Sequence, residues 1–508
     1  MKIIGVCFFT LCLLSIATAS TFPQAASESS ISTASWLANA LEQISADRML
    51  ADIKVLSAPE LRGRQSGSQE DAASASFVAN RFSELRLHRS PALHPEHGTS
   101  PLPQQDWKQT SPVARRTIDD QIRLNLIYSH ARSTLRGGVD FLPVLDSPSA
   151  DHHAQIVFVG YGLSDPARGI DDYAGLDVHN KIVLFLRGKP DKYAGTATHA
   201  DKERLARQNG AIAYLTATGP ILTPYEQRRG VTGKPGAFYS TTESAHQLPG
   251  AWISTEIAEA LITESTGGET TLRALQEEIN RTRASRSISL NVWVELEWTS
   301  HLDNGILFNV ISISRGYSSS DDAVLIGAHR DHFGHQAGLL FAGADDNASG
   351  TAVLLEVARV LALAPAAPKR SILFVSFSGE EQGLLGSRLY VSQPILPLEK
   401  TVVMINVDHA GTGNGRLTIG VTGLEKRQAE TFGQEAGVSD KLDVFGFFPG
   451  GDHVPFKEAG VPTLTVVSGG IHPHFHQPSD TVETINPAIL QSVARYVLAC
   501  VWKLANAP

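Results

Sequence analysis

The distribution of apolar residues divides the C-terminal part of the chain into alternating strand and helix segments. Unbroken apolar runs occupy 323–327, 371–377, 401–407 and 463–467. Such runs are typical of strands that are buried on both faces of a parallel sheet. Apolar residues with helical spacing lie between the runs, most clearly over 348–364. Strand and helix in alternation predict an α/β fold with a mostly parallel central sheet.

The N-terminal and middle parts of the chain show different patterns. Apolar residues recur with helical spacing over 35–87, whereas 88–116 is rich in Pro, His and Gln and is predicted to be a surface loop. Between 150 and 300, short strand-like runs are separated by Gly and Pro, which predicts a β-rich module of its own. The predicted strands of this module are 155–161, 181–187, 211–217 and 287–298, and its predicted helices are 201–209 and 256–263.

The first residues have the pattern of a secretion signal. Lys2 precedes an apolar run from Ile3 to Ala17, and Ala17-Thr18-Ala19 has the small residues of a cleavage site. A membrane anchor is the alternative, but the run is short for a span of about 20 residues. We therefore expect residues 1–19 to be a signal peptide. The mature protein is expected to be secreted, either periplasmic or extracellular, with no stable membrane insertion.

Cysteine content and charge narrow the class of protein further. Cys7 and Cys12 lie in the expected signal, so Cys500 alone would remain and no disulfide would form within the mature chain. A large hydrophobic core can stabilise an exported protein without disulfides. The formal net charge is −9 over 508 residues, with no dense cluster of Lys and Arg. This charge argues against a nucleic-acid partner, which usually needs a basic face.

Side chains that can bind a metal follow each of the four C-terminal apolar runs, and another lies between the first two runs. In chain order these residues are His329, Asp331, Asp345, Glu380, Glu381, Asp408 and His476. The carboxyl ends of parallel strands meet at one edge of a sheet, so we expect these side chains to converge. Imidazole and carboxylate groups are good zinc ligands, and a pair of metal ions about 3.5–4 Å apart needs a carboxylate that can bridge them. The pattern therefore predicts a hydrolase with paired metals.

Around these side chains the sequence resembles the M28 family of zinc aminopeptidases. The motifs that carry the resemblance are Gly327-Ala328-His329-Arg330-Asp331-His332, Gly343-Ala344-Asp345-Asp346-Asn347-Ala348-Ser349-Gly350, Phe377-Ser378-Gly379-Glu380-Glu381-Gln382-Gly383, Asn406-Val407-Asp408, Gly451-Asp452-His453-Val454-Pro455-Phe456 and His476-Gln477-Pro478-Ser479-Asp480. The resemblance implies a three-layer α/β sandwich with a mixed, mostly parallel central sheet. It also implies two Zn²⁺ ions per chain.

The same resemblance implies which residues hold the two ions. Asp345 would bridge both. Glu381 and His476 would complete the protein ligands of one ion, and His329 and Asp408 would complete those of the other.

Two further residues would serve the reaction if the resemblance holds. Glu380 would be the general base that takes a proton from a metal-bound water. Asp331 would form a hydrogen bond with His329 and fix its tautomer. Asp346, which follows the expected bridging residue, would lie where the family often has a strained peptide bond.

The resemblance continues outside the strand ends and implies a domain organisation. Leu56–Arg64 is similar to the N-terminal segment of the family, and the β-rich region looks like a protease-associated domain inserted in the peptidase. Residues 20–148 would be a leader and the first part of the peptidase, 149–298 the inserted domain, and 299–508 the metallopeptidase core.

The expected activity is that of a secreted di-zinc exopeptidase that hydrolyses the N-terminal bonds of peptides or proteins. One alternative is a glutamate-type carboxypeptidase, which would need Arg side chains facing its pocket, with Arg330 as the candidate. Another is a receptor-like protein without activity, although the ligand positions and the base are all present here. The third is a single-zinc glutaminyl cyclase, which usually lacks an inserted domain.

A few positions depart from the family pattern or leave two roles open. His409 follows the ligand Asp408 where many relatives have Met, and Phe447 and Phe448 lie where some relatives use a Tyr hydroxyl to assist the oxyanion. That contact therefore has no predicted donor. For Asp480, contact with the site and capping of the next helix both remain possible.

Overall fold

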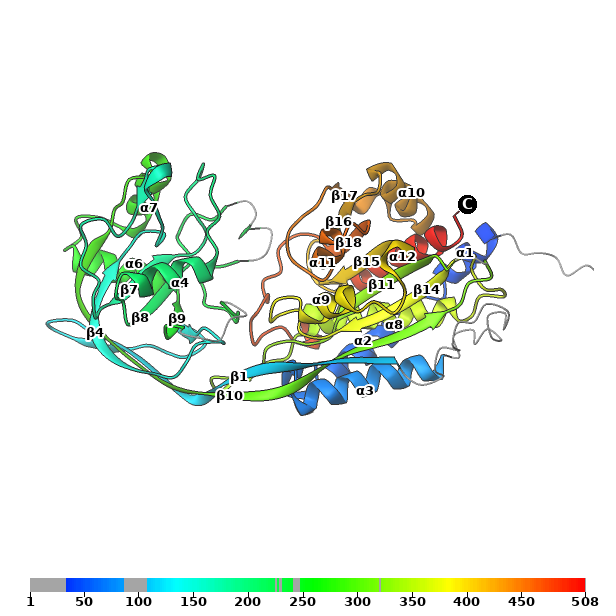
Figure 1. The fold of residues 1–508 in the computed structure, drawn as a ribbon, viewed down its shortest axis with the longest axis horizontal. Coiled ribbons are helices and arrows are strands. Elements are labelled where there is room, and N and C mark those ends of the chain that lie inside the picture. Colours follow the sequence, from blue (N-terminus) through cyan, green and yellow to red (C-terminus); the bar gives the residue numbers. More distant parts are fainter. Residues whose placement is uncertain are drawn as a thin grey trace, which may run out of the picture.

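The computed structural model describes residues 33–85, 107–223, 226–227, 231–240, 247–318 and 321–507. The chain forms two lobes joined by a long antiparallel ribbon of two strands, β1 (Trp107–Ile127) and β10 (Ile288–Ser314) (Figure 1). The first lobe contains the N-terminal helices and the chain after β10. The second lobe contains the end of β1, the start of β10 and the chain between these two strands.

The first lobe is built on a mixed sheet with the strand order β17-β16-β18-β15-β11-β14-β10. Its strands beyond β10 are β11 (Ala323–His329), β14 (Ser371–Phe377), β15 (Thr401–Asp408), β16 (Leu417–Thr422), β17 (Leu442–Phe445) and β18 (Thr463–Ser468), with a separate hairpin of β12 (Gly334–Gln336) and β13 (Leu339–Phe341). Neighbouring strands among β14, β11, β15 and β18 pair in parallel. On either side of these four, β10 pairs antiparallel with β14, and β16 pairs antiparallel with β18. The four predicted buried strands are thus confirmed as the parallel centre of the sheet.

Helices cover both faces of this sheet. Val324 and Ile326 of β11 lie in one hydrophobic core, while Leu325 between them lies in another. The first core is closed by α1 (Thr33–Leu41), α2 (Ala46–Leu56), α3 (Gln69–Glu84), α8 (Gly350–Leu361), α10 (Lys426–Ala436) and α12 (Pro487–Ala505), and the second by α9 (Leu385–Ser392) and α11 (His453–Glu458). The expected three-layer α/β sandwich is confirmed.

Helix α12 is apolar because it lies inside the first core. Among the described residues it is the one helix that is long and apolar enough to cross a membrane, and 78% of its apolar window is buried inside the protein. Core helices of this kind meet the same criteria of length and composition. The expected signal peptide, residues 1–19, lies outside the described residues.

The second lobe extends the same sheet through the order β10-β4-β7-β8-β9-β3. Its elements are β2 (Arg132–Thr134), β3 (Phe141–Pro143), β4 (Ala150–Phe158), β5 (Ser164–Asp165), β6 (Ile170–Asp171), β7 (Ile182–Leu186), α4 (His199–Gln208), β8 (Ala213–Ala217), β9 (Gly250–Ile253), α6 (Thr255–Ser265) and α7 (Leu272–Thr282). The neighbours β4, β7, β8 and β9 pair in parallel. The described part of this lobe therefore continues the sheet of the first lobe and adds the helices α4, α6 and α7.

The borders of the second lobe differ from those expected. Strand β10 runs without a break across the border at 298/299, and β3, upstream of 149, pairs with β9. Residues 107–116, predicted as loop, belong to β1. The reason is that the ribbon between the lobes is largely exposed over 299–306, so no apolar alternation marks it in the sequence.

A buried arginine joins the N-terminal segment to the loops at the carboxyl edge of the sheet. The Arg64 guanidinium donates hydrogen bonds to the carbonyl oxygens of Arg330 (2.6 Å), Ala342 (2.7 Å) and Gly343 (2.9 Å). These carbonyls flank the segments that carry the predicted metal ligands. The similarity of Leu56–Arg64 to a family segment therefore has a structural basis here, because Arg64 fixes two loops at once.

Candidate metal centre

The predicted ligand positions converge at the carboxyl edge of the first lobe's sheet. His329 and Asp408 are the last residues of β11 and β15, and Glu381 follows β14. His476 lies in the loop after β18, and the turn 344–349 leads into α8. Side chains from four neighbouring parallel strands thus meet, as their order along the chain predicted.

Asp346 lies at the centre of the cluster. Its Oδ1 is 3.4 Å from His329 Nε2, and its Oδ2 is 3.2 Å from His476 Nε2. Asp408 Oδ1 lies 3.4 Å from the same His329 nitrogen, and Glu381 Oε2 lies 3.7 Å from the His476 nitrogen. Each oxygen of the Asp346 carboxylate therefore faces one histidine–carboxylate pair.

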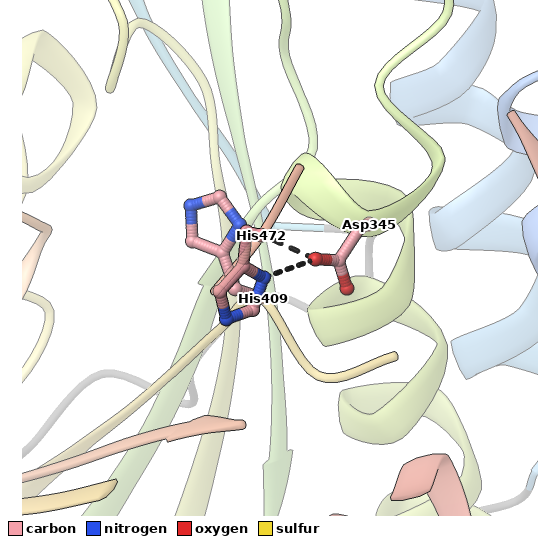
Figure 2. A group of neighbouring side chains, drawn as sticks. All are labelled: Asp345, His409 and His472. Atoms are coloured by element: carbon pink, nitrogen blue, oxygen red, sulfur yellow. Dashed lines mark hydrogen bonds and ion pairs between the residues drawn. The ribbon is translucent and has the colours of Figure 1, made fainter. Parts of the chain in front are cut away.

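The expectation that Asp345 occupies this central position is wrong. Its carboxylate points away from the cluster and accepts hydrogen bonds from the Gly411 amide (2.7 Å) and the Thr412 hydroxyl (2.6 Å). Figure 2 shows its contacts with His472 Nδ1, at 2.8 Å, and with His409 Nδ1, at 3.5 Å. The cis peptide bond lies between Asp346 and Asn347, one residue later than expected. Adjacent side chains on this turn point in different directions, and the repeated Asp in the sequence gave no means of choosing between them.

Asp480 holds the backbone of this turn. One of its carboxylate oxygens accepts a hydrogen bond from the Asp345 amide at 2.8 Å, and the other accepts one from the Asp346 amide at 3.0 Å. The next helix with a side-chain cap is α12, whose N-cap is Asn486. Of the two roles left open for Asp480, contact with the site is the one that the structure supports.

One residue, Asp331, orients both His329 and Glu380. His329 Nδ1 lies 3.2 Å from the Asp331 carbonyl oxygen and 3.6 Å from its Oδ1, which leaves Nε2 directed at Asp346 and Asp408. The Glu380 amide lies 3.3 Å from Asp331 Oδ1. Asp331 therefore has the positioning geometry that the resemblance implied, with its backbone carbonyl as the nearer acceptor.

His476 is oriented from the second lobe. Its Nδ1 donates a hydrogen bond to the Ala237 carbonyl at 2.8 Å, and the Ala237 amide donates one to the His476 carbonyl at 2.9 Å. This pair of bonds leaves Nε2 facing Asp346 and Glu381. The sequence contained no signal for the contact, because a backbone carbonyl is present at every residue.

Other histidines without a predicted role also lie in the cluster. His332 Nδ1 is 2.7 Å from Glu381 Oε1, and His409 Nε2 is 3.5 Å from Asp346 Oδ2. Both rings are buried or nearly so. Both place imidazole nitrogens beside the central carboxylates. In the sequence each directly follows a residue that already had a predicted role, Asp331 or Asp408, so neither was assigned a role.

Burial and the crowding of acids shift the pKa values of the carboxyl groups in the cluster. Burial raises the pKa of Glu380 to about 8, and Asp408 and Asp452 add to this effect. Burial, together with Asp346 and Glu380, raises the pKa of Glu381 well above its usual range. For Asp346, burial is outweighed by His409 and His476, which hold its pKa well below the usual range. Cations placed among these acids would stabilise all of them in the ionised form.

The donor set and its spacing fit zinc. Imidazole and carboxylate ligands hold zinc at about 2.0–2.2 Å in tetrahedral sites, which places neighbouring ligand atoms about 3.4 Å apart. The donor atoms around Asp346 are separated by 3.2–3.7 Å. Two groups share this residue, one with His329 and Asp408 and one with His332 and Glu381. The buried His332 Nε2 has no hydrogen-bond partner among the described residues.

Comparison with known proteins agrees with this geometry. Residues 309–501 match the model of the family described as Peptidase family M28. We call this matched stretch the M28 domain. It carries every residue of the cluster, whereas the second lobe lies outside the matched residues, and its identification as a protease-associated domain stays a prediction.

Curated relatives of the M28 domain carry two kinds of name. The chain is 32% identical over 207 residues to "Aminopeptidase YwaD" of Bacillus subtilis, which covers 38% of this chain and 44% of the relative. It is 31% identical over 205 residues to a "Probable leucine aminopeptidase" of Arthroderma benhamiae (37% and 56%) and 30% identical over 376 residues to the "Probable glutamate carboxypeptidase VP8" of Zea mays (66% and 50%). The chain thus spans about half the length of these relatives.

Solved structures share the complete two-lobed fold. An aminopeptidase from Aneurinibacillus sp. strain AM-1 superposes with a TM-score of 0.63 at 21% identity, covering 92% of this chain and 95% of that one. A Peptidase M28 precursor from Shewanella amazonensis SB2B superposes with a TM-score of 0.67 at 18% identity, covering 94% and 97%. The second lobe is therefore part of a fold that these two solved structures share.

Proposed function

We propose that the M28 domain is a two-zinc aminopeptidase that removes single residues from peptide N-termini after export of the protein. The observation that carries the proposal is the position of Asp346, whose two carboxylate oxygens face two separate histidine–carboxylate pairs. Two-metal hydrolases need such a bridging carboxylate. Names of relatives and the signal pattern of residues 1–19 support the exopeptidase activity and the secretion.

Five side chains would hold the metal ions. Asp346 would be shared, with His329 and Asp408 on one side and Glu381 and His476 on the other. When bound, zinc supplies Lewis acidity that polarises a carbonyl group and lowers the pKa of water from 15.7 to about 7.

Glu380 is placed to move the proton. It follows β14 beside Glu381, and its buried side chain lies among acids that raise its affinity for a proton. As a carboxylate it accepts a proton from the attacking water, and as a carboxylic acid it returns that proton to the leaving amine. The hydrogen bond between its amide and Asp331 fixes the start of this turn.

The choice of peptide end rests on charge. Bound zinc would offset the charge of its ligands Asp346, Glu381 and Asp408. Asp331 and Glu380 would remain as acids beside the centre, which favours a substrate with a free ammonium group over one with a free carboxylate at this position. Arg330, the candidate anchor under the carboxypeptidase alternative, does not face the cluster in that role. It is fully buried and forms an ion pair with Asp71 at 2.7 Å.

The test compares the metal-loaded full chain with Glu380→Gln, using Glu430→Gln on the exposed side of α10 as the matched control. Aminoacyl p-nitroanilides, N-acetylated peptides and C-amidated peptides serve as substrates. We expect cleavage of substrates with a free amine, loss on chelation, and a fall of about 10²–10⁴-fold in kcat for Glu380→Gln. Metal content should stay at two equivalents in both variants.

Three results would overturn the proposal. These are turnover of N-acetylated peptides alone, undiminished kcat in Glu380→Gln, or a single metal equivalent at saturation. The first result would instead support a carboxypeptidase, the kind of enzyme that the name of the maize relative describes.

A further inference from the structure

A cavity lies between the two lobes, next to the metal centre. Its volume is about 570 Å³, within the range of small-molecule binding sites. The M28 domain lines it with Pro473, Phe475, His476 and Gln477, and the second lobe provides the remaining wall. His476 therefore faces both the cavity and Asp346, so a molecule in the cavity lies beside the reacting centre.

The wall from the second lobe is basic. Its charged residues are Arg187, Lys189, Lys202, Lys234 and Glu226, four basic and one acidic. The whole chain, by contrast, carries a formal net charge of −9. A basic cavity in an acidic protein, beside an acidic metal centre, favours an anionic occupant.

Packing holds two of these basic side chains, Arg187 and Lys202, in place. The Arg187 guanidinium carbon lies 3.9 Å from the Trp252 ring centroid and 4.6 Å from that of Phe238, so it packs against both rings. Buried Lys202 donates hydrogen bonds to the carbonyls of Leu186 (2.6 Å) and Gly188 (2.5 Å), the two neighbours of Arg187. The position of Arg187 is therefore fixed before any ligand arrives, which lowers the entropy cost of binding.

Two buried polar atoms in the same wall also lack a partner. The Nε1 of Trp252, a residue only 6% exposed, and the Nε2 of His199 have no hydrogen-bond partner among the described residues. Both residues line the cavity. The Trp252 Nε1–H is a donor, and a buried donor without an acceptor is uncommon in folded proteins and calls for an acceptor in the ligand or in bound water.

We propose that this cavity binds a carboxylate in the leaving part of the peptide, so that the protein prefers short or acidic peptides. The inference rests on the proposed aminopeptidase function. In a peptide the ammonium end is attracted to Asp331 and Glu380, the acids of the cluster that are not assigned to the metals. The carboxylate of the leaving part is attracted to Arg187, Lys189 and Lys234. Both attractions orient the scissile bond in the same direction across His476.

The experiment uses the metal-loaded full chain and five substrates. Leu-Ala-Ala is compared with its C-terminal amide, Leu-Asp-Ala-amide with Leu-Asn-Ala-amide, and Leu-p-nitroanilide serves as the substrate without a carboxylate. The variants are Arg187→Met, exposed Lys189→Met, and Arg204→Met as control, since Arg204 is an exposed residue of the same lobe outside the cavity.

We expect kcat/KM to favour the carboxylate over its uncharged counterpart by about tenfold, the effect of one charge-assisted hydrogen bond. Arg187→Met should remove this preference through KM, Lys189→Met should reduce it, and Arg204→Met should keep it. Turnover of the nitroanilide should stay within about twofold in all three variants. The first pair of peptides reports a terminal carboxylate and the second pair a side-chain carboxylate.

Equal kcat/KM for charged and uncharged peptides would overturn the inference and leave the aminopeptidase intact, because the nitroanilide would still be cleaved. An equal loss on all substrates in Arg187→Met would also overturn it. If no substrate turns over, calorimetric titration of Leu-Ala-Ala and its amide into the Glu380→Gln protein still decides the matter. A Kd ratio of one would then refute the carboxylate site.

Discussion

Two regions meet at His476, the acidic cluster of the M28 domain and the basic cavity wall of the second lobe. They differ in the sign of their charge and in the chain segments that form them. On the M28 side, the ends of parallel strands carry acids around Asp346. On the other side, the second lobe presents basic and aromatic residues around Arg187. The contrast teaches that the second lobe completes the centre, because it supplies both a charged wall and the backbone acceptor for His476.

The two histidines at the centre show the same division. His329 is oriented by Asp331, two residues away in its own domain. His476 is oriented by Ala237, which is 239 residues away in the second lobe. Imidazole ligands usually donate their second N–H to a carbonyl or carboxylate, so both arrangements have the same chemical effect. They differ in location: the orientation of His329 depends on its own domain, whereas the orientation of His476 depends on the second lobe.

The largest effect is expected from substitution of the central acid of the cluster, Asp346. In Asp346→Asn the shared carboxylate loses its charge and one of its ligand oxygens, so we expect the loss of both metal equivalents and of detectable turnover. In Asp345→Asn the contacts with Gly411 and His472 weaken, so turnover should fall by about 10–100-fold with metal retained. Elemental analysis and kcat/KM of the two variants provide the measurement.

Circular dichroism controls for folding in this pair. The central role of Asp346 would be contradicted if Asp345→Asn lost both metal equivalents while Asp346→Asn retained them.

The next effect compares the two ways of orienting a histidine. Asp331→Asn should weaken the ion near His329, and Ala237→Pro should weaken the ion near His476, each by about 10–100-fold in affinity. Proline removes the amide that donates to the His476 carbonyl, whereas Ala237→Gly keeps it and serves as the control. Metal titration with a competing chelator measures each variant. Unchanged affinity in Ala237→Pro would show that the second lobe does not support the metal centre.

Much of the first lobe was predictable because its signals are local. The unbroken apolar runs marked β11, β14, β15 and β18, and parallel strands bring their carboxyl ends to one edge. The convergence of His329, Glu381, Asp408 and His476 followed from that topology.

The remaining features were beyond local signals. Asp345 and Asp346 are identical residues in sequence and differ only in the direction that the turn gives their side chains. The Ala237 contact uses backbone atoms, and the ribbon of β1 and β10 is exposed where it joins the lobes. The basic cavity forms only when segments from both lobes come together, so no single stretch of sequence contains it.

The smallest expected effect separates the two sides of His476 by their response to salt. Lys189 and Lys234 are exposed, so their attraction for a carboxylate should be screened as the Debye length falls from about 10 Å at 0.1 M to about 3 Å at 1 M salt. The acids around Asp346 are buried and are screened much less. Raising sodium chloride over this range should therefore lower the kcat/KM ratio of Leu-Ala-Ala to its amide by about two- to threefold, while the rate on Leu-p-nitroanilide stays nearly constant. In Lys189→Met the salt dependence of the ratio should shrink, and in Arg204→Met it should not change. A parallel fall on all substrates would mean that salt acts on the metal centre and that the two sides do not differ in this way.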